Sequence, residues 1–143
     1  MRRATIAGWL ASSALLLCAA ASAGHDESLY ARLGGQTGVA GISNDLIDRA
    51  AVDPRTERTW RKVGLTRVKS HLTEYLCSVT GGPCEYTGDS MKDIHAGMNI
   101  GEAEMFALVE QLREIMIARE VGLRERNELL ALLAPSKRDI VTR

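Results

Sequence analysis

Apolar residues recur at intervals of three and four through most of this chain, and this spacing constrains the fold more than any other feature. The pattern occupies four segments, at residues 36–52, 65–79, 103–119 and 124–134. Such spacing puts an apolar stripe along one face of each helix. No stretch after residue 24 alternates apolar and polar residues for long enough to predict a strand. The sequence therefore predicts an all-α domain of five or six helices around one core.

The first 23 residues have the composition of a secretory signal peptide. An arginine pair at positions 2 and 3 precedes an apolar run, and Ala21-Ser22-Ala23 supplies the small residues of a cleavage site. We therefore predict a signal peptide at residues 1–23 and a mature domain at residues 24–143. The expected location is an exported compartment, most simply the bacterial periplasm.

The sequence indicates neither nucleic-acid binding nor a membrane anchor. The chain has 18 basic and 18 acidic residues, so no positive excess favours nucleic acid. Cys18 would be the anchored residue of a lipoprotein, but Leu17 before it is bulkier than such a site normally takes. Membrane anchoring is therefore not expected, and the mature protein is predicted to be a monomer or a weak dimer.

Cys77 and Cys84 are the cysteines that remain after cleavage, and they flank a Gly81-Gly82-Pro83 turn. In an oxidising compartment this spacing favours a disulfide, with two free thiols as the alternative. Neither cysteine belongs to a Cys-x-x-Cys pair or a Cys-x-x-Cys-His motif. Thioredoxin-like chemistry and c-type haem attachment therefore lack their main sequence feature.

His95 lies in a short predicted helix that follows a loop rich in glycine and proline. Asp89 or Ser90 can cap this helix, and Asp93 stands three residues after Ser90, as in a capping box. Helical spacing places His95 on the same apolar face as Met91. Because an unpaired buried polar group costs about 1–3 kcal/mol, the ring needs a backbone carbonyl or a metal as partner. From these residues alone, a core histidine and a metal ligand both stay open.

Two further residues need an explanation at this stage. His71 lies at the edge of the apolar stripe of the helix predicted at residues 65–79. Trp60 stands in a polar link between two predicted helices, where a large indole is rarely left without something to cover. It either covers the core or lines a ligand site.

The chain also contains a series of motifs in a fixed order. The series consists of Ser28-Leu29-Tyr30-x-x-Leu33-Gly34-Gly35, Asp53-Pro54, Gly81-Gly82-Pro83-x-x-Tyr86-Thr87-Gly88-x-x-Met91-x-x-x-His95-x-Gly97-x-x-Ile100, Leu133-Ala134-Pro135 and Arg138-Asp139-Ile140-Val141. Together these motifs resemble the truncated haemoglobins of the first group. The resemblance covers residues 28–141, nearly the whole mature chain.

This resemblance implies a two-over-two helical sandwich that holds haem b, with His95 as the proximal iron ligand. Such a ligand must be a neutral imidazole presented from an apolar wall. Met91 would pack on the proximal side of the haem, and Ile100 would close that side. Tyr86 and Thr87 would lie near the haem edge, where a hydroxyl reaches a propionate.

The distal side departs from the family pattern. Leu46-Ile47 stands where relatives have adjacent aromatics, the second a tyrosine that hydrogen-bonds bound oxygen, and Trp60 replaces a phenylalanine. With Val68 and Leu72 added, this pocket has no hydroxyl or amide donor. His71 is then the polar distal candidate, and cyanobacterial relatives use a histidine at the matching position as a sixth iron ligand.

Three interpretations of His71 follow from the resemblance. It coordinates the iron when no gas is bound, swings away to hydrogen-bond a ligand, or lies at the pocket mouth. Arg67 or Lys69 would supply charge to the second propionate, or they are solvated surface residues.

The first functional hypothesis is a haem protein that binds O₂ or another diatomic gas, with nitric oxide dioxygenation as a related activity. The missing distal tyrosine weakens the oxygen-storage version. The alternative is a six-coordinate His71/His95 haem for electron transfer, redox sensing, or NO, nitrite or peroxide chemistry, served by an unidentified reductase. A helical domain without haem is the third hypothesis, and it requires both histidines to be ordinary core residues.

Overall fold

The computed structural model describes residues 27–143, and this part of the chain is helical almost throughout. In chain order the elements are α1 (Leu29–Arg32), α2 (Gly35–Ala50), the 3-10 turn η1 (Glu57–Thr59), α3 (Leu65–Val79), α4 (Met91–Ile94), α5 (Glu102–Ala118), α6 (Leu123–Leu133), the 3-10 turn η2 (Ala134–Ser136) and α7 (Lys137–Ile140). The predicted all-α fold is confirmed. The predicted signal peptide at residues 1–23 lies outside the described residues. Between residues 27 and 143, no helix is long and apolar enough to span a membrane.

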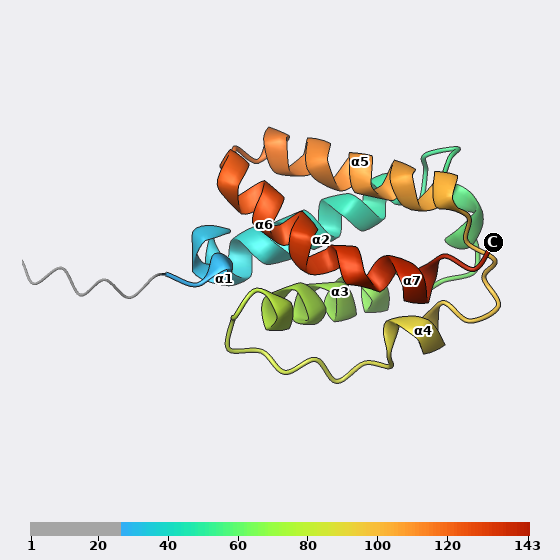
Figure 1. The fold of residues 1–143 in the computed structure, drawn as a ribbon, viewed down its shortest axis with the longest axis horizontal. Coiled ribbons are helices and arrows are strands. Elements are labelled where there is room, and N and C mark those ends of the chain that lie inside the picture. Colours follow the sequence, from blue (N-terminus) through green and yellow to red (C-terminus); the bar gives the residue numbers. More distant parts are fainter. Residues whose placement is uncertain (1–26) are drawn as a thin grey trace, which may run out of the picture.

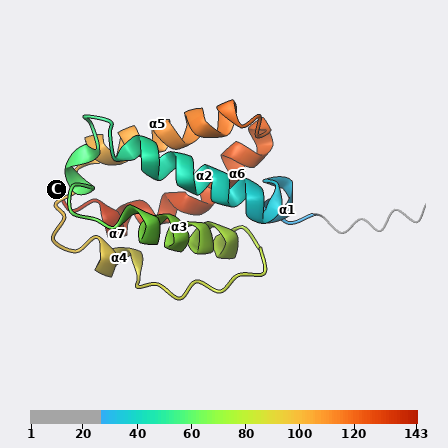
Figure 2. The ribbon, with the colours of Figure 1, turned by 180° about the vertical axis from the view of Figure 1, so that it is seen from behind.

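Helix α2 is the central element, because it packs along both α3 and α5. Helices α5 and α6 form the second pair, joined by a short turn at one end of the molecule (Figure 1). From there α6, η2 and α7 run on as one arm that passes α3 and ends beside α4 (Figures 1 and 2). The long segment between α3 and α4 closes the open side of the molecule.

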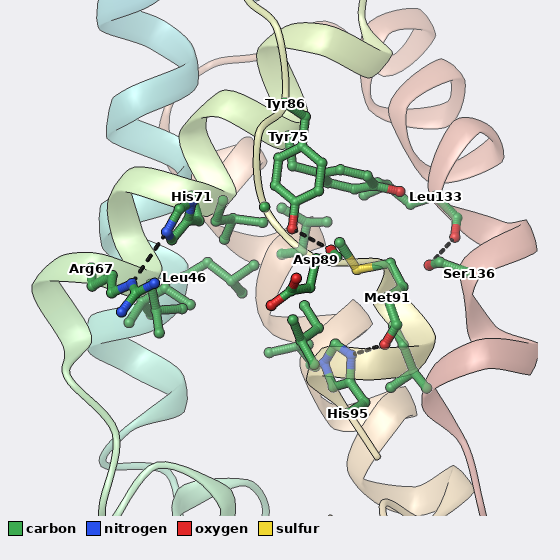
Figure 3. Close-up of a pocket in the computed structure, with 18 of the residues that line it drawn as sticks. Leu46, Arg67, His71, Tyr75, Tyr86, Asp89, Met91, His95, Leu133 and Ser136 are labelled. Atoms are coloured by element: carbon green, nitrogen blue, oxygen red, sulfur yellow. Dashed lines mark hydrogen bonds between the residues drawn. The ribbon is translucent and has the colours of Figure 1, made fainter.

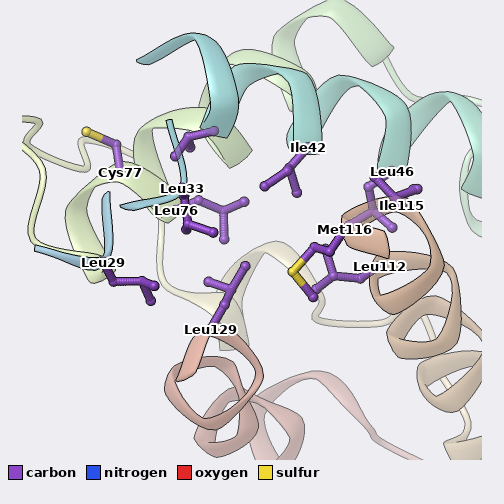
Figure 4. Close-up of a cluster of buried hydrophobic side chains, with 11 residues drawn as sticks. Leu29, Leu33, Ile42, Leu46, Leu76, Cys77, Leu112, Ile115, Met116 and Leu129 are labelled. Carbon is purple, nitrogen blue, oxygen red and sulfur yellow. The ribbon is translucent and has the colours of Figure 1, made fainter. Parts of the chain in front are cut away.

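The hydrophobic core lies where α1, α2, α3, α5 and α6 meet (Figure 4). Its buried members are Leu29, Leu33, Val39, Ile42, Leu46, Leu76, Cys77, Leu112, Ile115, Met116 and Leu129. Most of them come from the half of the molecule that holds α1 and the turn between α5 and α6. Packing energy is therefore concentrated at this end, and the end that carries α4 is free to form a cavity.

The turn between α5 and α6 reverses the chain without a glycine at the point of reversal. Helix α5 ends at Ala118, and Gly122 precedes α6 as its N-cap. The reversal occurs at Glu120, whose φ is 58°. The N–H groups of Glu120 and Val121 donate to carbonyl oxygens of the last helical turn, which closes the helix without a glycine.

Pro135 follows α6 but does not end the helical part of the chain. Helix α6 does end at Leu133, but the chain continues through η2 into α7. Proline is tolerated in the first turn of a helical segment, where its missing N–H would have no partner. The arm therefore reaches the cavity instead of ending at the core.

Cys77 and Cys84 are bonded to each other in the structure. The bond ties the last turn of α3 to the segment that leads to α4, and Cys77 is fully buried in the core. Gly82 lies inside this loop, and a Cβ atom there would come within 2.6 Å of the Cys77 sulfur. The absence of a side chain at Gly82 therefore permits the tight connection.

Glu104, in the first turn of α5, is the centre of an ion-pair network. Its carboxylate accepts hydrogen bonds from Arg58, from Arg143 and from the Gly101 N–H. Arg58 also donates to two carbonyl oxygens of the segment between α4 and α5. Burial by itself would raise the pKa of Glu104, but the hydrogen bonds from Gly101, Arg58 and Arg143 outweigh it and lower that pKa. The network fixes the segment that follows His95.

We predict that Glu104→Gln lowers the free energy of unfolding by about 1–2 kcal/mol at pH 7, because a neutral amide cannot replace the charged hydrogen bonds. The folded-state pKa of Glu104 is lowered, so its contribution is present above the ordinary glutamate pKa of about 4.3 and is lost as the pH falls. Urea unfolding at pH 7 and pH 3 measures both effects.

The control for this prediction is Glu114→Gln. Glu114 pairs with Arg49 on the surface and is 46% exposed, so its loss should change the stability by less than about 0.5 kcal/mol. Equal effects of the two substitutions, or a Glu104 effect that persists at pH 3, would contradict the assignment.

Candidate functional site

A cavity of about 510 Å³ lies between α3 and α4 (Figure 3). Apolar side chains from α2, α3 and α5 form most of its wall: Leu46, Ile47, Val68, Leu72, Met105, Leu108, Val109 and Leu112. Leu46 and Leu112 belong to both the core and the cavity wall. The volume lies in the usual range for a site that holds a small molecule or cofactor.

His95 enters the cavity at the C-terminal end of α4, immediately after the last helical residue. The Ser90 side chain caps this short helix by accepting a hydrogen bond of 3.1 Å from the Asp93 N–H, as one of the sequence alternatives predicted. Nδ1 of His95 lies 2.7 Å from the carbonyl oxygen of Met91, one turn earlier (Figure 3). Within residues 27–143, no hydrogen bond engages Nε2.

This geometry prepares His95 to bind a metal. A carbonyl oxygen can only accept, so Nδ1 carries the proton and the neutral ring keeps its lone pair on Nε2. Metal-binding histidines usually donate their other ring N–H in this way, which fixes both tautomer and orientation. His95 therefore has its own backbone partner and still offers a ligand atom.

His71 lines the cavity from α3. Its Nε2 accepts a hydrogen bond of 3.3 Å from Nε of Arg67, and its Nδ1 lies 3.5 Å from Oε2 of Glu74. Figure 3 shows His71 and His95 on different walls of the cavity. The two histidines that the sequence singled out are therefore brought to one site by separate elements.

All but one of the predicted cofactor-contacting residues line this cavity: His95, His71, Met91, Trp60, Ile47, Val68, Leu72, Tyr86 and Thr87. Ile100 is the exception, and the expectation that it closes the proximal side is corrected here. It is buried, but it pairs with Val141 in a parallel bridge, and its carbonyl oxygen accepts from the Thr142 N–H. Asn99, with a φ of 51°, turns the chain just before it, and Ile94 lines the cavity from α4.

Tyr86 and Thr87 lie at one edge of the cavity, but the Tyr86 hydroxyl already has a partner. It donates a hydrogen bond of 2.8 Å to the carbonyl oxygen of Asp89, and its ring contacts that of Tyr75 edge to face. Burial is the main cause that raises the pKa of Tyr86, and the charge of Asp89 adds to it. The phenol therefore stays protonated. Contact with a propionate would require it to leave Asp89.

The two cationic candidates differ in position. Arg67 lines the cavity, whereas Lys69 pairs with Asp48 at 2.5 Å and does not. Arg67 is thus the candidate that remains for an anionic group at the cavity edge.

Sequence reasoning missed the contribution of the C-terminal arm. Leu133, Ser136 and Ile140 line the cavity, whereas the sequence placed Leu133 in the helix predicted at residues 124–134 and indicated Ile140 only as part of a family motif. The family motif was the sequence feature that could have indicated this contribution. Helical spacing could not, because the apolar stripe of α6 is interrupted at Pro135. The side chains of α5 that face the cavity were expected to belong to the core.

The residues present fit a haem group. The walls are largely apolar, one histidine offers a free lone pair, and a second histidine lies on another wall. The indole N–H of Trp60 is buried without a hydrogen-bond partner among the described residues, which is unusual unless another group completes the site. This donor set matches haem iron held by a proximal histidine.

The order of the helices, together with a cavity that holds two histidines, defines a globin of the two-over-two class. The family model described as "Bacterial-like globin" matches residues 28–142. The chain therefore belongs to the bacterial-like globin family. Globins bind haem through a proximal histidine, and the distal pocket controls how the iron meets diatomic gases.

Among curated proteins, the group 1 truncated hemoglobin of Nostoc commune is 28% identical over 96 residues, which cover 67% of this chain and 81% of that protein. The group 1 truncated hemoglobin of Mycolicibacterium paratuberculosis is 26% identical over 115 residues, which cover 80% and 85% of the two chains. Each alignment therefore spans most of the relative's own length.

Solved structures show the same fold. Truncated hemoglobin from Tetrahymena pyriformis, in its Fe(III) form, superposes with a TM-score of 0.78 at 21% identity, covering 82% of this chain and all of that one. The 2/2 hemoglobin from Synechococcus sp. PCC 7002, in the cyanomet state and with covalently attached heme, gives 0.76 at 20% identity with the same coverage. The two-over-two fold is thereby confirmed.

Proposed function

We propose that this chain binds haem b in the cavity between α3 and α4, and that a diatomic gas such as O₂, NO or CO binds on the side that His71 faces. The observation that carries the proposal is the hydrogen bond from Nδ1 of His95 to the Met91 carbonyl, which leaves Nε2 free for a metal. When bound, haem supplies an iron centre with one position open to a gas.

Non-covalent haem b is favoured by two features of the sequence. The chain has no Cys-x-x-Cys-His motif, which c-type attachment requires. No histidine follows His95, so the residue that some relatives use for a covalent link to a vinyl group is missing. The chain is therefore expected to hold haem without a covalent link to the porphyrin.

The distal wall determines which chemistry the site favours. Ile47, Val68 and Leu72 make this side apolar, and none of their side chains donates a hydrogen bond. Donation to a bound ligand falls to His71 or to the unpartnered indole N–H of Trp60. Gas binding with weak stabilisation of O₂ is the expected result.

A second candidate function rests on His71. A histidine on another wall of the same cavity is suited to be a sixth iron ligand, and this would favour electron transfer, redox sensing, or NO and peroxide chemistry. An unidentified reductase would then supply electrons.

We also propose that residues 1–23 direct export to the periplasm, where the bond between Cys77 and Cys84 forms. Support comes from the arginine pair, the apolar run and the Ala21-Ser22-Ala23 site. Oxidising compartments preserve such bonds.

We predict that His95→Gly weakens haem retention by more than about tenfold and removes the absorption bands of histidine-bound ferrous haem. Added imidazole should restore those bands, because it replaces the missing ligand without a covalent link. Lys92→Ala is the control, since Lys92 is exposed on α4 and does not line the cavity. An unchanged spectrum in His95→Gly would refute the proximal role.

The second candidate function predicts that the reduced wild type, without added gas, shows the split visible bands of low-spin six-coordinate haem, and that His71→Ala converts them to a five-coordinate high-spin spectrum. Residues 27–143 contain two histidines, His71 and His95. Once His71 is replaced, His95 is therefore the one imidazole in these residues that can bind the iron. A five-coordinate spectrum in the wild type would reject the second candidate function and favour simple gas binding.

We predict that protein purified from the periplasm and then unfolded shows no free thiol, and that its reduction lowers the free energy of unfolding by about 2.5 kcal/mol, the chain-entropy value for so short a loop. Cys77→Ser/Cys84→Ser should lose a similar amount. Two reactive thiols in the exported protein would disprove the disulfide.

A further inference from the structure

His71 lies between two charged residues of its own helix, Arg67 one turn earlier and Glu74 one turn later. Figure 3 shows the hydrogen bond between Arg67 and His71. Nε of Arg67 is 3.3 Å from Nε2 of His71, and Oε2 of Glu74 is 3.5 Å from Nδ1. The side chains of His71 and Glu74 are each about one third exposed, yet these two facing atoms are buried. Neither has a hydrogen-bond partner among the described residues.

Both neighbours select the same tautomer of His71. The guanidinium of Arg67 can only donate, so Nε2 must accept and must carry the lone pair. The proton of the neutral ring is then on Nδ1, the nitrogen that faces the Glu74 carboxylate. A buried donor and a buried acceptor that face each other gain free energy by closing the remaining gap, because each is costly to leave unpaired.

We propose that Arg67 and Glu74 form a clamp that sets how readily His71 binds the haem iron. Glu74 accepts from Nδ1–H and so keeps the lone pair on Nε2, where a metal can use it. Arg67 occupies that same lone pair and holds it away from the iron. This inference rests on the proposed haem function, and it makes Arg67 and Glu74 positioning residues rather than ligands.

The two arms of the clamp act in opposite directions. The Nε2 lone pair accepts one partner at a time, so the hydrogen bond from Arg67 competes with coordination. Without Glu74, the proton is free to move to Nε2, and the lone pair needed for coordination is lost. Because the side chains of His71 and Glu74 are about one third exposed, a hydrogen bond of typical net strength would shift such an equilibrium by between about twofold and about tenfold.

The test uses the full-length mature, haem-loaded protein with Arg67→Ala and Glu74→Ala. The absorption spectrum of the reduced protein measures the six-coordinate fraction. The rate of CO binding is an independent measure of the same equilibrium, because CO can bind only when His71 is not on the iron. We expect Arg67→Ala to raise the six-coordinate fraction and slow CO binding by about twofold to tenfold. Glu74→Ala should lower that fraction and speed CO binding by a similar factor.

Two variants provide controls. Lys69→Ala removes a charge from the same helix, but Lys69 pairs with Asp48 and does not line the cavity, so it should behave as wild type. Glu74→Gln keeps an acceptor oxygen and should restore most of the six-coordinate fraction that Glu74→Ala loses. This rescue also guards against a general folding defect.

A second measurement reports the tautomer directly. In the reduced, CO-saturated protein, which is diamagnetic, the ¹⁵N shifts of His71 should place the proton on Nδ1 in the wild type. Glu74→Ala should show a mixture of the two tautomers. A wild-type proton on Nε2 overturns the clamp.

Other outcomes also overturn it. If both variants change the six-coordinate fraction in the same direction, the substitutions act only through the structure of α3. If both variants match the wild type, Arg67 and Glu74 do not control His71. Faster haem loss in Arg67→Ala with an unchanged equilibrium assigns Arg67 to a propionate. If the wild type binds no haem, the proposed function fails, while the ¹⁵N shifts of His71 in the protein as purified still test the tautomer separately.

Discussion

The hydrogen bond between Nδ1 of His95 and the Met91 carbonyl is the interaction on which the site depends, and a single turn of helix supports it. Helix α4 is too short to hold its shape by backbone bonding alone. The Ser90 cap fixes its start, and the segment after it is held by Arg58, by Glu104 and by the bridge from Ile100 to Val141. The geometry of His95 therefore relies on contacts with distant parts of the chain.

The position of the core explains why a cavity exists at all. Buried apolar residues gather at the end of the molecule that holds α1 and the turn between α5 and α6. At the other end, the connection after α3 and the arm formed by α6, η2 and α7 enclose space instead of filling it. The bond between Cys77 and Cys84 joins these two regions, because it anchors the start of the loop to a fully buried residue.

The distal wall combines an apolar surface with two nitrogen groups of different character. His71 has charged neighbours on both sides, whereas the Trp60 indole has no partner among the described residues. Where the walls are largely apolar, such groups interact more strongly than at the surface, so small changes in their partners carry large consequences. The proposed role of His71 therefore depends on its neighbours as much as on the imidazole itself.

The sequence by itself determined the helices, the ligand candidates and the family, because apolar spacing and ordered motifs are local properties that survive without coordinates. It did not determine that Ile100 pairs with Val141, that Glu120 ends α5, or that the arm beyond Pro135 lines the cavity. Helical spacing already puts Arg67 and Glu74 one turn from His71, but it did not determine that each faces a different ring nitrogen. These features depend on side-chain directions and on contacts between residues far apart in the chain, which only the tertiary structure decides.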